Sequence, residues 1–169
     1  MSNSENKAKT LVIGDMHLKE DLILSRVDQA IKKLDVNRVV FCGDYVDEWH
    51  SNRSIMLDAI DDFLTWIDGK RKHGLDVDFV LGNHDMQYLR GIPGPGTHTD
   101  LYKEVSEALT YMKVCDTFSL TPHLIAVGDG SMLLVEGTSA RVVTSEELGL
   151  ESWDMASWNW MNTYVLPFL

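Results

Sequence analysis

Residues 10–17 read TLVIGDMH, and this stretch decides the fold class that the sequence predicts. Its first four residues form a short, mostly apolar run that stops abruptly at Gly14 and Asp15. A buried strand that ends in a loop has this pattern, because the chain leaves the core within one or two residues. We therefore expect a strand over residues 10–13, with Asp15 and His17 just beyond its carboxyl end.

The same pattern occurs twice more along the chain. Apolar residues recur at helical spacing over residues 22–33 and predict an amphipathic helix, and a second apolar run over 38–42 again ends in Gly-Asp. A second helix is expected around residues 60–67, and the run 79–81 leads into Gly-Asn. Strands that alternate with helices over short connections form right-handed parallel crossovers. The sequence therefore predicts an α/β fold, with helices layered on a mixed, largely parallel central sheet.

The second half of the chain is less regular. Residues 91–97 contain three glycines and two prolines and are expected to form a loop. A helix is expected over 101–111, and further strands are expected at residues 117–120, 124–127 and 132–135. The last two of these strands are predicted to pair as a hairpin around a Gly-Asp-Gly turn.

Length and composition predict one compact domain. The 169 residues are 44% hydrophobic, which suffices for one buried core, and the chain is too short for two ordinary domains. We expect a flexible polar arm over residues 1–9 and a single domain over residues 10–169. No apolar run has the length of a secretory signal or a membrane span, so a cytoplasmic protein without a membrane partner is expected. Cys42 and Cys115 are expected to be buried, reduced thiols.

The formal net charge of -11 argues against nucleic acid as a partner, since proteins that bind it use Lys and Arg to contact the phosphates. The charge does not argue against phosphate chemistry. Divalent ions held by an acidic cluster dominate the local field and present a positive face to an anionic substrate.

Polar residues of the ligand type follow all three predicted strands. Because ligands in parallel sheets collect beyond the carboxyl ends of the strands, these side chains are expected to meet at one edge. Carboxylate and amide oxygens with an imidazole nitrogen form a donor set suited to manganese, iron or zinc. A carboxylate can bridge two ions, and the glycine before each ligand lets the backbone pass close to them. The candidate metal ligands are Asp15, His17, Asp44 and Asn83.

A general acid is expected beside these ligands. Two cations a few ångströms apart can clamp a phosphate and lower the pKa of a bridging water toward neutrality. The leaving oxygen then needs a proton, and His84, next to Asn83 in the sequence, is placed to supply it. Asp47 is the candidate acceptor of a hydrogen bond from His84, which would raise the imidazolium fraction.

Three segments, GDMH at 14–17, GDYVD at 43–47 and GNHD at 82–85, resemble the GDxH, GDxxD and GNH[DE] blocks of the calcineurin-like metallophosphoesterase superfamily. The resemblance implies a layered α/β sandwich, shortened at its C-terminus, that hydrolyses a phosphate ester as a phosphomonoesterase or protein phosphatase does. It implies two divalent ions, with Mn most expected and Fe, Zn, Mg, Co and Ni compatible. The substrate would be a phosphorylated small molecule, a nucleotide or a phosphoprotein. The implied roles are Asp15 and His17 on the first ion, Asp44 as the bridge, Asn83 on the second ion, and His84 with Asp47 as the acid dyad.

Two departures separate the chain from the protein Ser/Thr phosphatase branch. That branch continues its second block into a phosphate-binding arginine, where this sequence has Glu48, and it usually has glycine where Leu18 stands. An acidic side chain cannot replace the arginine contact. The chain is therefore more similar to bacterial or phage metallophosphoesterases.

The resemblance also implies a mid-chain histidine and a later GHxH pair, which the sequence lacks. Glu136 stands about where the mid-chain histidine is expected, and His123 is a second candidate replacement. No histidine follows Glu136, and the chain ends at Leu169, so we expect either a truncated chain or one that has lost part of its site. A non-catalytic binding or regulatory module is the alternative function.

The remaining histidines, His50, His73 and His98, lie in polar or loop surroundings and are expected to be solvated surface residues. The tryptophans near the C-terminus are expected to pack in the core. In a shortened chain they would instead cover a sheet edge or support self-association.

Overall fold

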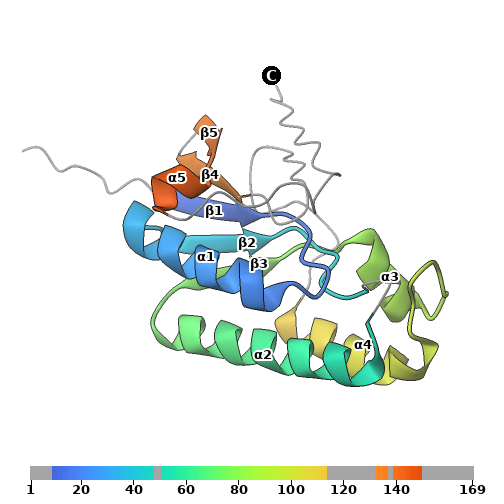
Figure 1. Cartoon of the computed structure of the whole chain (residues 1–169). Coiled ribbons are helices and arrows are strands. Elements are labelled where there is room, and N and C mark those ends of the chain that lie inside the picture. The colour runs from blue at the N-terminus through green and yellow to red at the C-terminus, as the bar shows by residue number, and fades with distance from the viewer. Residues whose placement is uncertain (1–8, 48–50, 114–131, 137–138, 150–169) are drawn as a thin grey trace, which may run out of the picture.

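The computed structural model describes residues 9–47, 51–113, 132–136 and 139–149. Within these residues the chain forms one mixed sheet with helices packed against it (Figure 1). The sheet has the strand order β3-β2-β1-β4-β5. Its strands are β1 (Lys9–Ile13), β2 (Arg38–Phe41), β3 (Asp76–Phe79), β4 (Met132–Glu136) and β5 (Ser139–Val142).

The first three strands run parallel to one another, whereas β4 is antiparallel to both of its neighbours. The parallel strands are joined by helical crossovers, as the alternation of strand and helix patterns predicted. The α/β class and the mixed sheet are therefore confirmed. Because β1, β2 and β3 are parallel, their carboxyl ends all lie at the same end of the strands, along one rim of the sheet.

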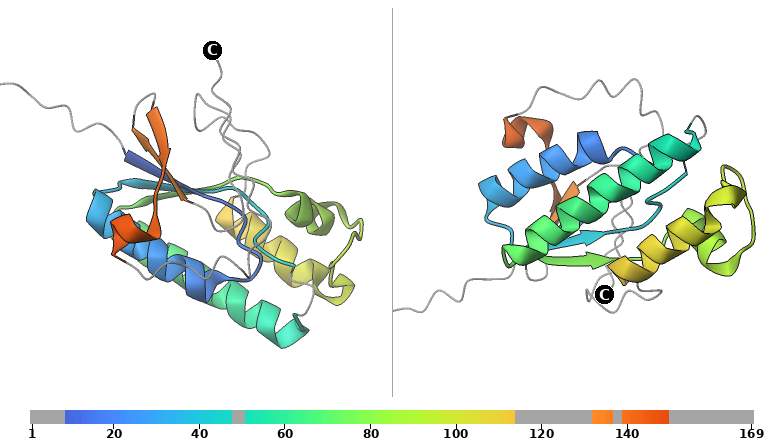
Figure 2. Two further views of the ribbon diagram at one scale, coloured as in Figure 1. Left: turned by 45° about the horizontal axis from the view of Figure 1, so that its top comes forward. Right: turned by 90° about the horizontal axis from the view of Figure 1, so that it is seen from below.

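The larger helices lie on the same face of the sheet (Figure 2). The helix predicted over 22–33 is α1, the one predicted around 60–67 lies within α2, and the one predicted over 101–111 is α4. The helical segments are α1 (Glu20–Leu34), α2 (Arg53–Lys72), α3 (Asn83–Arg90), the 3₁₀ turn η1 (Thr99–Leu101), α4 (Tyr102–Met112) and α5 (Ser145–Leu148).

The third strand begins and ends earlier than the sequence predicted. The expected strand 79–81 overlaps β3 only at Phe79. In β3 the exposed Asp76 and half-buried Asp78 alternate with the buried Val77 and Phe79. β3 is an edge strand of the described sheet, so half of its residues face water and the apolar run that marks a fully buried strand is missing.

The fourth strand was predicted correctly, but its partner was not. Residues 132–135 lie in β4, which pairs with β1 and with β5 rather than in the predicted hairpin. The expected strands 117–120 and 124–127 lie outside the described residues. All four residues of β5 are exposed, so this strand carries no apolar alternation by which the sequence could reveal it.

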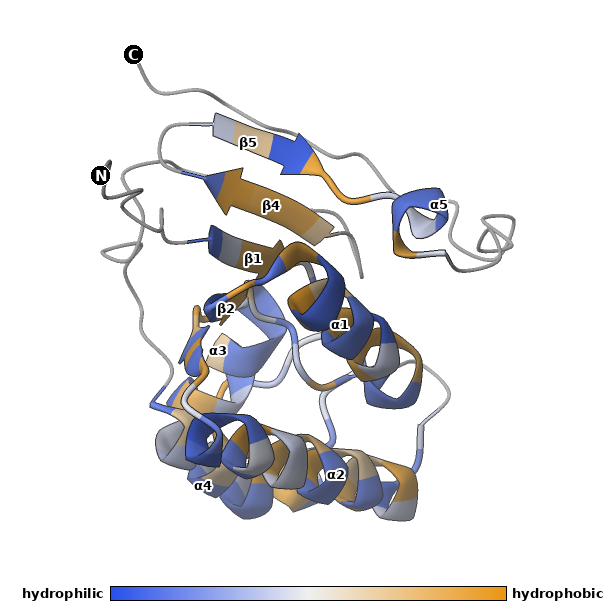
Figure 3. Ribbon diagram, turned by 90° about the vertical axis from the view of Figure 1, so that its left-hand side faces the viewer, coloured by the Kyte–Doolittle hydropathy of each residue, from blue (hydrophilic) through white to orange (hydrophobic). Residues whose placement is uncertain are grey.

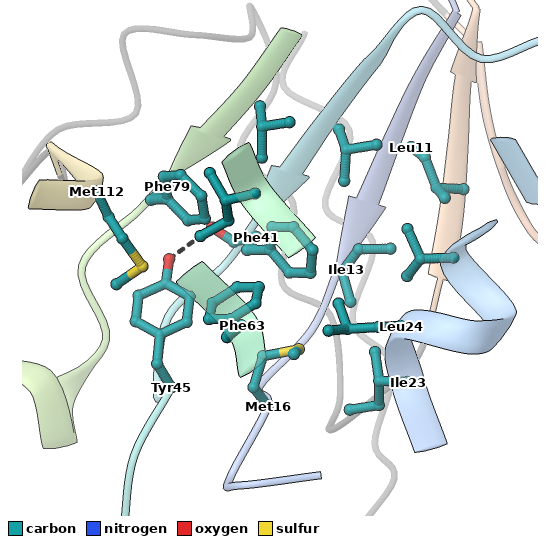
Figure 4. Packing of buried hydrophobic residues seen from close by; sticks show 14 of the residues in the cluster. Leu11, Ile13, Met16, Ile23, Leu24, Phe41, Tyr45, Phe63, Phe79 and Met112 are labelled. Atoms are coloured by element: carbon teal, nitrogen blue, oxygen red, sulfur yellow. Dashed lines mark hydrogen bonds between the residues drawn. The ribbon is translucent and has the colours of Figure 1, made fainter. Parts of the chain in front are cut away.

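The core lies between the sheet and the helices. Leu11 and Ile13 face the helical layer together with aromatic residues from β2, α2 and β3 (Figure 4). The ring centroids of Phe41 lie 5.1 Å from Phe63 and 5.7 Å from Phe79. Val12 is buried on the opposite face of the sheet, so β1 is buried on both faces, which explains its continuous apolar sequence. Strand β4 is likewise hydrophobic along most of its length, whereas the helices carry both polar and apolar faces (Figure 3).

Tyr45 joins the ends of two strands inside this core. Its single hydroxyl proton is shared between the carbonyl oxygens of Val80 at 2.7 Å and Phe41 at 3.1 Å. The side chain is only 2% exposed, and burial raises the pKa of its phenol well above the ordinary value, so the hydroxyl keeps its proton. The carboxyl ends of β2 and β3 are thereby held side by side.

The described sheet has two edges, β3 and β5. Exposed edges present unpaired backbone groups that favour pairing with another chain, and self-association remains a prediction. Among the described helices, none combines the length and the apolarity that crossing a membrane requires. The tryptophans Trp153, Trp158 and Trp160 lie outside the described residues.

Glu20, the first residue of α1, is a buried carboxyl group. It is 4% exposed and lies among apolar side chains of α2 and α4. Within the described part of the chain its Oε2 has no hydrogen-bond partner. Burial raises the pKa of Glu20 from 4.5 to about 8, because the apolar surroundings disfavour the charged form.

Replacing Glu20 by glutamine should flatten the dependence of stability on pH. Between about pH 4.5 and 8 the folded state holds a proton on Glu20 that the unfolded state has released, so the stability of the native protein falls as pH rises. One such proton gives a slope of up to about 1.4 kcal/mol per pH unit in the free energy of unfolding. Urea unfolding of the metal-free protein from pH 5 to 8 measures this slope, which Glu20→Gln should reduce.

Glu107→Gln provides the matched control, because the Glu107 side chain is 69% exposed on α4. It should leave the slope unchanged. An equal slope in the native protein and in Glu20→Gln would contradict a buried, protonated Glu20.

Candidate metal centre

The loops that follow β1, β2 and β3 meet beyond the carboxyl ends of these strands. The carbonyl oxygen of Asp44, in the loop after β2, accepts hydrogen bonds from the backbone N–H groups of Met16 at 3.1 Å and His17 at 2.8 Å. The N–H of Leu18 bonds the carbonyl of Tyr45 at 3.3 Å. The first two ligand-bearing loops are therefore tied to each other through their backbones.

Asp85 ties the third loop to the second. Its carboxylate is fully buried and accepts hydrogen bonds from the N–H groups of Asp44 at 2.8 Å, Tyr45 at 3.0 Å and Gly82 at 2.9 Å. Burial raises the pKa of Asp85 to about 7, although the hydrogen bonds from the three N–H groups act in the opposite direction and lower it. Asp85 is not among the site residues that the sequence predicted, although it stands at the third helical position of α3, where a carboxylate caps the helix start.

Three of the four predicted ligands converge on one point. The donor atoms of Asp15, His17 and Asp44 all lie within 4.8 Å of one another. His17 Nε2 lies 3.9 Å from Asp44 Oδ2. Asp44 is 5% exposed, whereas Asp15 and His17 are half-buried. Two carboxylates and an imidazole at these separations have the donor types that bind manganese, iron or zinc.

Hydrogen bonds orient two of these donors toward each other. His17 Nδ1 lies 3.0 Å from the carbonyl oxygen of Asp47 and donates to it, since a carbonyl can only accept. This bond assigns the proton to Nδ1 and leaves the lone pair on Nε2, the nitrogen that faces Asp44. Asp44 Oδ1 accepts the N–H of His84 at 2.9 Å, so its other oxygen, Oδ2, faces His17.

The amide of Asn83 completes the group. The amide atom that faces Asp44 lies 3.1 Å from Oδ2. With a cation between the two groups the amide presents its oxygen there, and without one its NH₂ donates to the carboxylate. The structure thus brings Asp15, His17, Asp44 and Asn83 together, and the donor set fits a divalent cation. Their roles as ligands remain a prediction.

His84 and Asp47 lie beside the four candidate ligands. His84 Nδ1 is 3.3 Å from Asp47 Oδ2, and the imidazole of His84 packs edge to face on that of His17, with centroids 5.4 Å apart. Asp47 is 4% exposed. Burial raises the pKa of Asp47, and the hydrogen bonds from Tyr88 and His84 lower it. The predicted hydrogen-bonded pair is present in the geometry, and its catalytic role stays a prediction.

The backbone of the site is strained. Four residues that are not glycine have left-handed backbones there, with φ values of 42° at His17, 56° at Leu18, 48° at Asp44 and 73° at Asp47. Each costs roughly 1–3 kcal/mol and persists only where the surroundings hold it, which is typical of functional sites. Among the described residues, the other two such positions, Asp35 and Lys113, cap the ends of helices.

Leu18 stands where the protein Ser/Thr phosphatase branch usually has glycine. Its backbone is left-handed, a conformation that glycine adopts without strain, which explains why a glycine suits this position. In this chain the leucine side chain is 8% exposed and packs in the main core. Its burial offsets the backbone strain.

Two glycines let the second and third loops touch. Gly43 has φ 104°, and a Cβ on it would lie 2.3 Å from the backbone nitrogen of Gly82. A Cβ on Gly82 would lie 2.1 Å from Asp44 Oδ1. No side chain fits at either position, so these two glycines allow the loops to approach each other, and the close approach of the backbone to metal ions stays a prediction.

Glu136 cannot replace a missing metal ligand. β4 is antiparallel to β1, with Glu136 opposite Lys9 and Met132 opposite Ile13. The metal centre follows Ile13, so Glu136 lies at the far end of the sheet, four residues or about 13 Å away along the strand. There its carboxylate is 3.8 Å from Lys9 Nζ.

His98 is not the solvated surface residue that the sequence analysis expected. It is half-buried, its Nε2 lies 3.3 Å from Ser51 Oγ, and its positive form would lower the pKa of Asp47. His73 is exposed, as predicted. No local sequence signal brings His98 close enough to act on the pKa of Asp47, because its position depends on the path of the glycine- and proline-rich loop before it.

Cys42 is a free, half-buried thiol, and burial raises its pKa to about 12, with a further contribution from the charge of Asp15. A thiol that keeps its proton is a poor nucleophile, so Cys42 has a packing role. The other residues singled out in the sequence analysis, Glu48, His50, Cys115 and His123, lie outside the described residues.

A model of the calcineurin-like phosphoesterase family matches residues 8–167 of the sequence. The match covers nearly the whole chain, including all three loops of the metal centre. No curated protein matches the sequence closely enough to count as a relative.

Replacing Gly82 by alanine should weaken metal binding. The added Cβ would push against Asp44, so the carboxylate and the loop must move, and we expect the affinity for Mn²⁺ to fall about tenfold or more. Isothermal titration with Mn²⁺ and the metal-dependent shift in melting temperature measure the effect.

Gly69→Ala provides the control, because a Cβ at Gly69, inside α2, would meet no atom within 4 Å. It should keep the Mn²⁺ affinity and stabilise the protein by about 0.5–1 kcal/mol. Unchanged affinity in Gly82→Ala would count against a metal centre at these loops.

Proposed function

The chain belongs to the calcineurin-like phosphoesterase family, and from this premise we propose that it hydrolyses a phosphate ester at a dinuclear metal centre held by Asp15, His17, Asp44 and Asn83. The observation that carries the proposal is the convergence of three donor atoms within 4.8 Å, with the hydrogen-bonded His84 and Asp47 beside them. This combination serves phosphate transfer to water, which needs charge neutralisation and a proton for the leaving oxygen.

Two divalent ions, when bound, would polarise the phosphate and supply an activated water at neutral pH. The residues of the chain hold the donors in place before any ion binds. His17 is fixed by its bond to the Asp47 carbonyl, and Asp44 by its bond to the His84 N–H. Such outer contacts commonly change metal affinity 10- to 100-fold when they are removed.

His84 acts as the general acid. Asp47 accepts from Nδ1, so Nε2 is the nitrogen that carries the proton to the leaving oxygen. The Asp47 carboxylate also stabilises the imidazolium form of His84, which a general acid must populate. The general acid is expected to contribute about 10²–10⁴ to the rate.

The proposed substrate is a phosphomonoester carried by a small molecule, a nucleotide or a protein. The net charge of -11 makes the bound ions the main attraction for the anionic group. Manganese is the proposed native ion, because three of the four donors are carboxylate or amide oxygens, the donor type that suits Mn.

Hydrolysis of p-nitrophenyl phosphate with added Mn²⁺ tests the proposal. The native protein should be active, and Asp44→Asn should lose both the activity and the metal-dependent rise in melting temperature, because it removes a charge from the shared ligand. His84→Ala should keep the melting shift and lose activity on phenyl phosphate, whose leaving group needs the proton, by about 10²–10⁴. Bis-p-nitrophenyl phosphate, assayed in parallel, should be the poorer substrate.

Asp58→Asn makes the same chemical change on the exposed side of α2 and should alter neither activity nor metal binding. If no divalent ion gives either activity or a melting shift, the proposed function is wrong and the chain is a non-catalytic binding module.

A further inference from the structure

Tyr88 contacts Asp47 from inside the protein, and Asp47 with His84 forms the proposed acid pair. It lies on α3 one helical turn after His84, so the two side chains share a face of the helix. Its side chain is only 3% exposed, and its hydroxyl donates a hydrogen bond to Asp47 Oδ1. It is not one of the four candidate metal ligands.

The two oxygens of Asp47 are therefore used by two residues of the same helix. Oδ2 faces His84 Nδ1 at 3.3 Å, and Oδ1 accepts from Tyr88. Asp47 itself stands on a loop with a strained backbone, φ 73°, so no regular secondary structure fixes the direction of its carboxylate. The bond to Tyr88 fixes that direction, since a carboxylate held at both oxygens cannot rotate.

A further contact decides which way the Tyr88 hydroxyl points. The backbone N–H of His98 donates to the Tyr88 oxygen at 3.0 Å. A phenol has one proton, and an N–H can only donate, so the oxygen accepts from His98 and its own proton goes to Asp47. The loop before His98 is itself held against α3, because Gln87 Oε1 accepts from the Gly94 N–H at 3.0 Å and from the Thr97 hydroxyl.

We propose that Tyr88, oriented by the His98 N–H, is a positioning residue that holds Asp47 so that His84 presents its proton to the leaving oxygen. This inference rests on the proposed function and adds the loop 91–98 to the parts on which the acid depends. The residue acts through Asp47 and does not touch the substrate. Without the hydroxyl, Asp47 is free to turn away from His84, and misplacement of a reacting group by about 1 Å can cost 10²-fold in rate.

Tyr88→Phe tests this role through the leaving group. Phenyl phosphate needs a proton on its leaving oxygen, whereas p-nitrophenyl phosphate leaves readily as the anion. The variant should lose about 10- to 100-fold in kcat on phenyl phosphate and less than about threefold on p-nitrophenyl phosphate. The Mn²⁺-dependent melting shift should stay unchanged.

Tyr102→Phe is the matched control. The Tyr102 ring packs on that of Tyr88, with centroids 5.6 Å apart, and within the described residues its hydroxyl has no hydrogen-bond partner. The control removes the same group from the same neighbourhood, so it should leave both rates as they are. Equal losses on the two substrates in Tyr88→Phe would show a merely structural role and overturn the proposal.

A second measurement does not depend on activity. In the metal-free protein, proton NMR should show a downfield His84 Nδ1–H resonance, assigned by its absence from His84→Ala, and a protected Tyr88 hydroxyl proton. Tyr88→Phe should weaken or abolish the His84 signal. If the native protein hydrolyses neither ester, the proposed function fails and the spectrum alone decides the positioning role, which an unchanged His84 resonance would disprove.

Discussion

The buried carboxylate of Asp85 is the contact on which the geometry of the site depends. It accepts three backbone N–H groups, from Asp44, Tyr45 and Gly82, and so joins the loop after β2 to the start of α3. A carboxylate buried without such donors would be costly, and with them it specifies one arrangement of two loops. The N–H of Asp44 bonds this side chain directly, and so does the N–H of Gly82, the residue before Asn83. Asp85 therefore holds Asp44 and Asn83 at a fixed separation.

The core supports this contact from below. The Tyr45 hydroxyl bonds the ends of β2 and β3, and its ring packs on those of Phe63 and Phe79. The loops above carry left-handed backbones at residues with side chains, which cost energy and need a rigid base. Close packing of aromatic side chains supplies this base, because a dense interior resists the small shifts that would relax the loops.

The sequence predicted the candidate ligands and the α/β class because both depend on a local rule: parallel strands end at one edge, and polar residues after each end must meet there. It failed where the outcome depends on distant contacts. Nothing local shows that β4 is antiparallel, so the sequence leaves Glu136 open as a replacement ligand, whereas the pairing with β1 puts it opposite Lys9, at the other end of the sheet. Tyr88 lies four residues after His84 and was recognisable by helical spacing, whereas the His98 N–H reaches the Tyr88 hydroxyl only through the path of its loop.

The candidate ligands and the acid pair are parts of one connected unit. Asp44 Oδ1 accepts the N–H of His84, while the Asp47 carbonyl accepts from His17. Residues of the two groups therefore orient each other: the backbone of His84 fixes the candidate ligand carboxylate of Asp44, and the carbonyl of Asp47 fixes the candidate ligand imidazole of His17. Any backbone shift of α3 moves Asn83 and His84 together, because they are its first two residues.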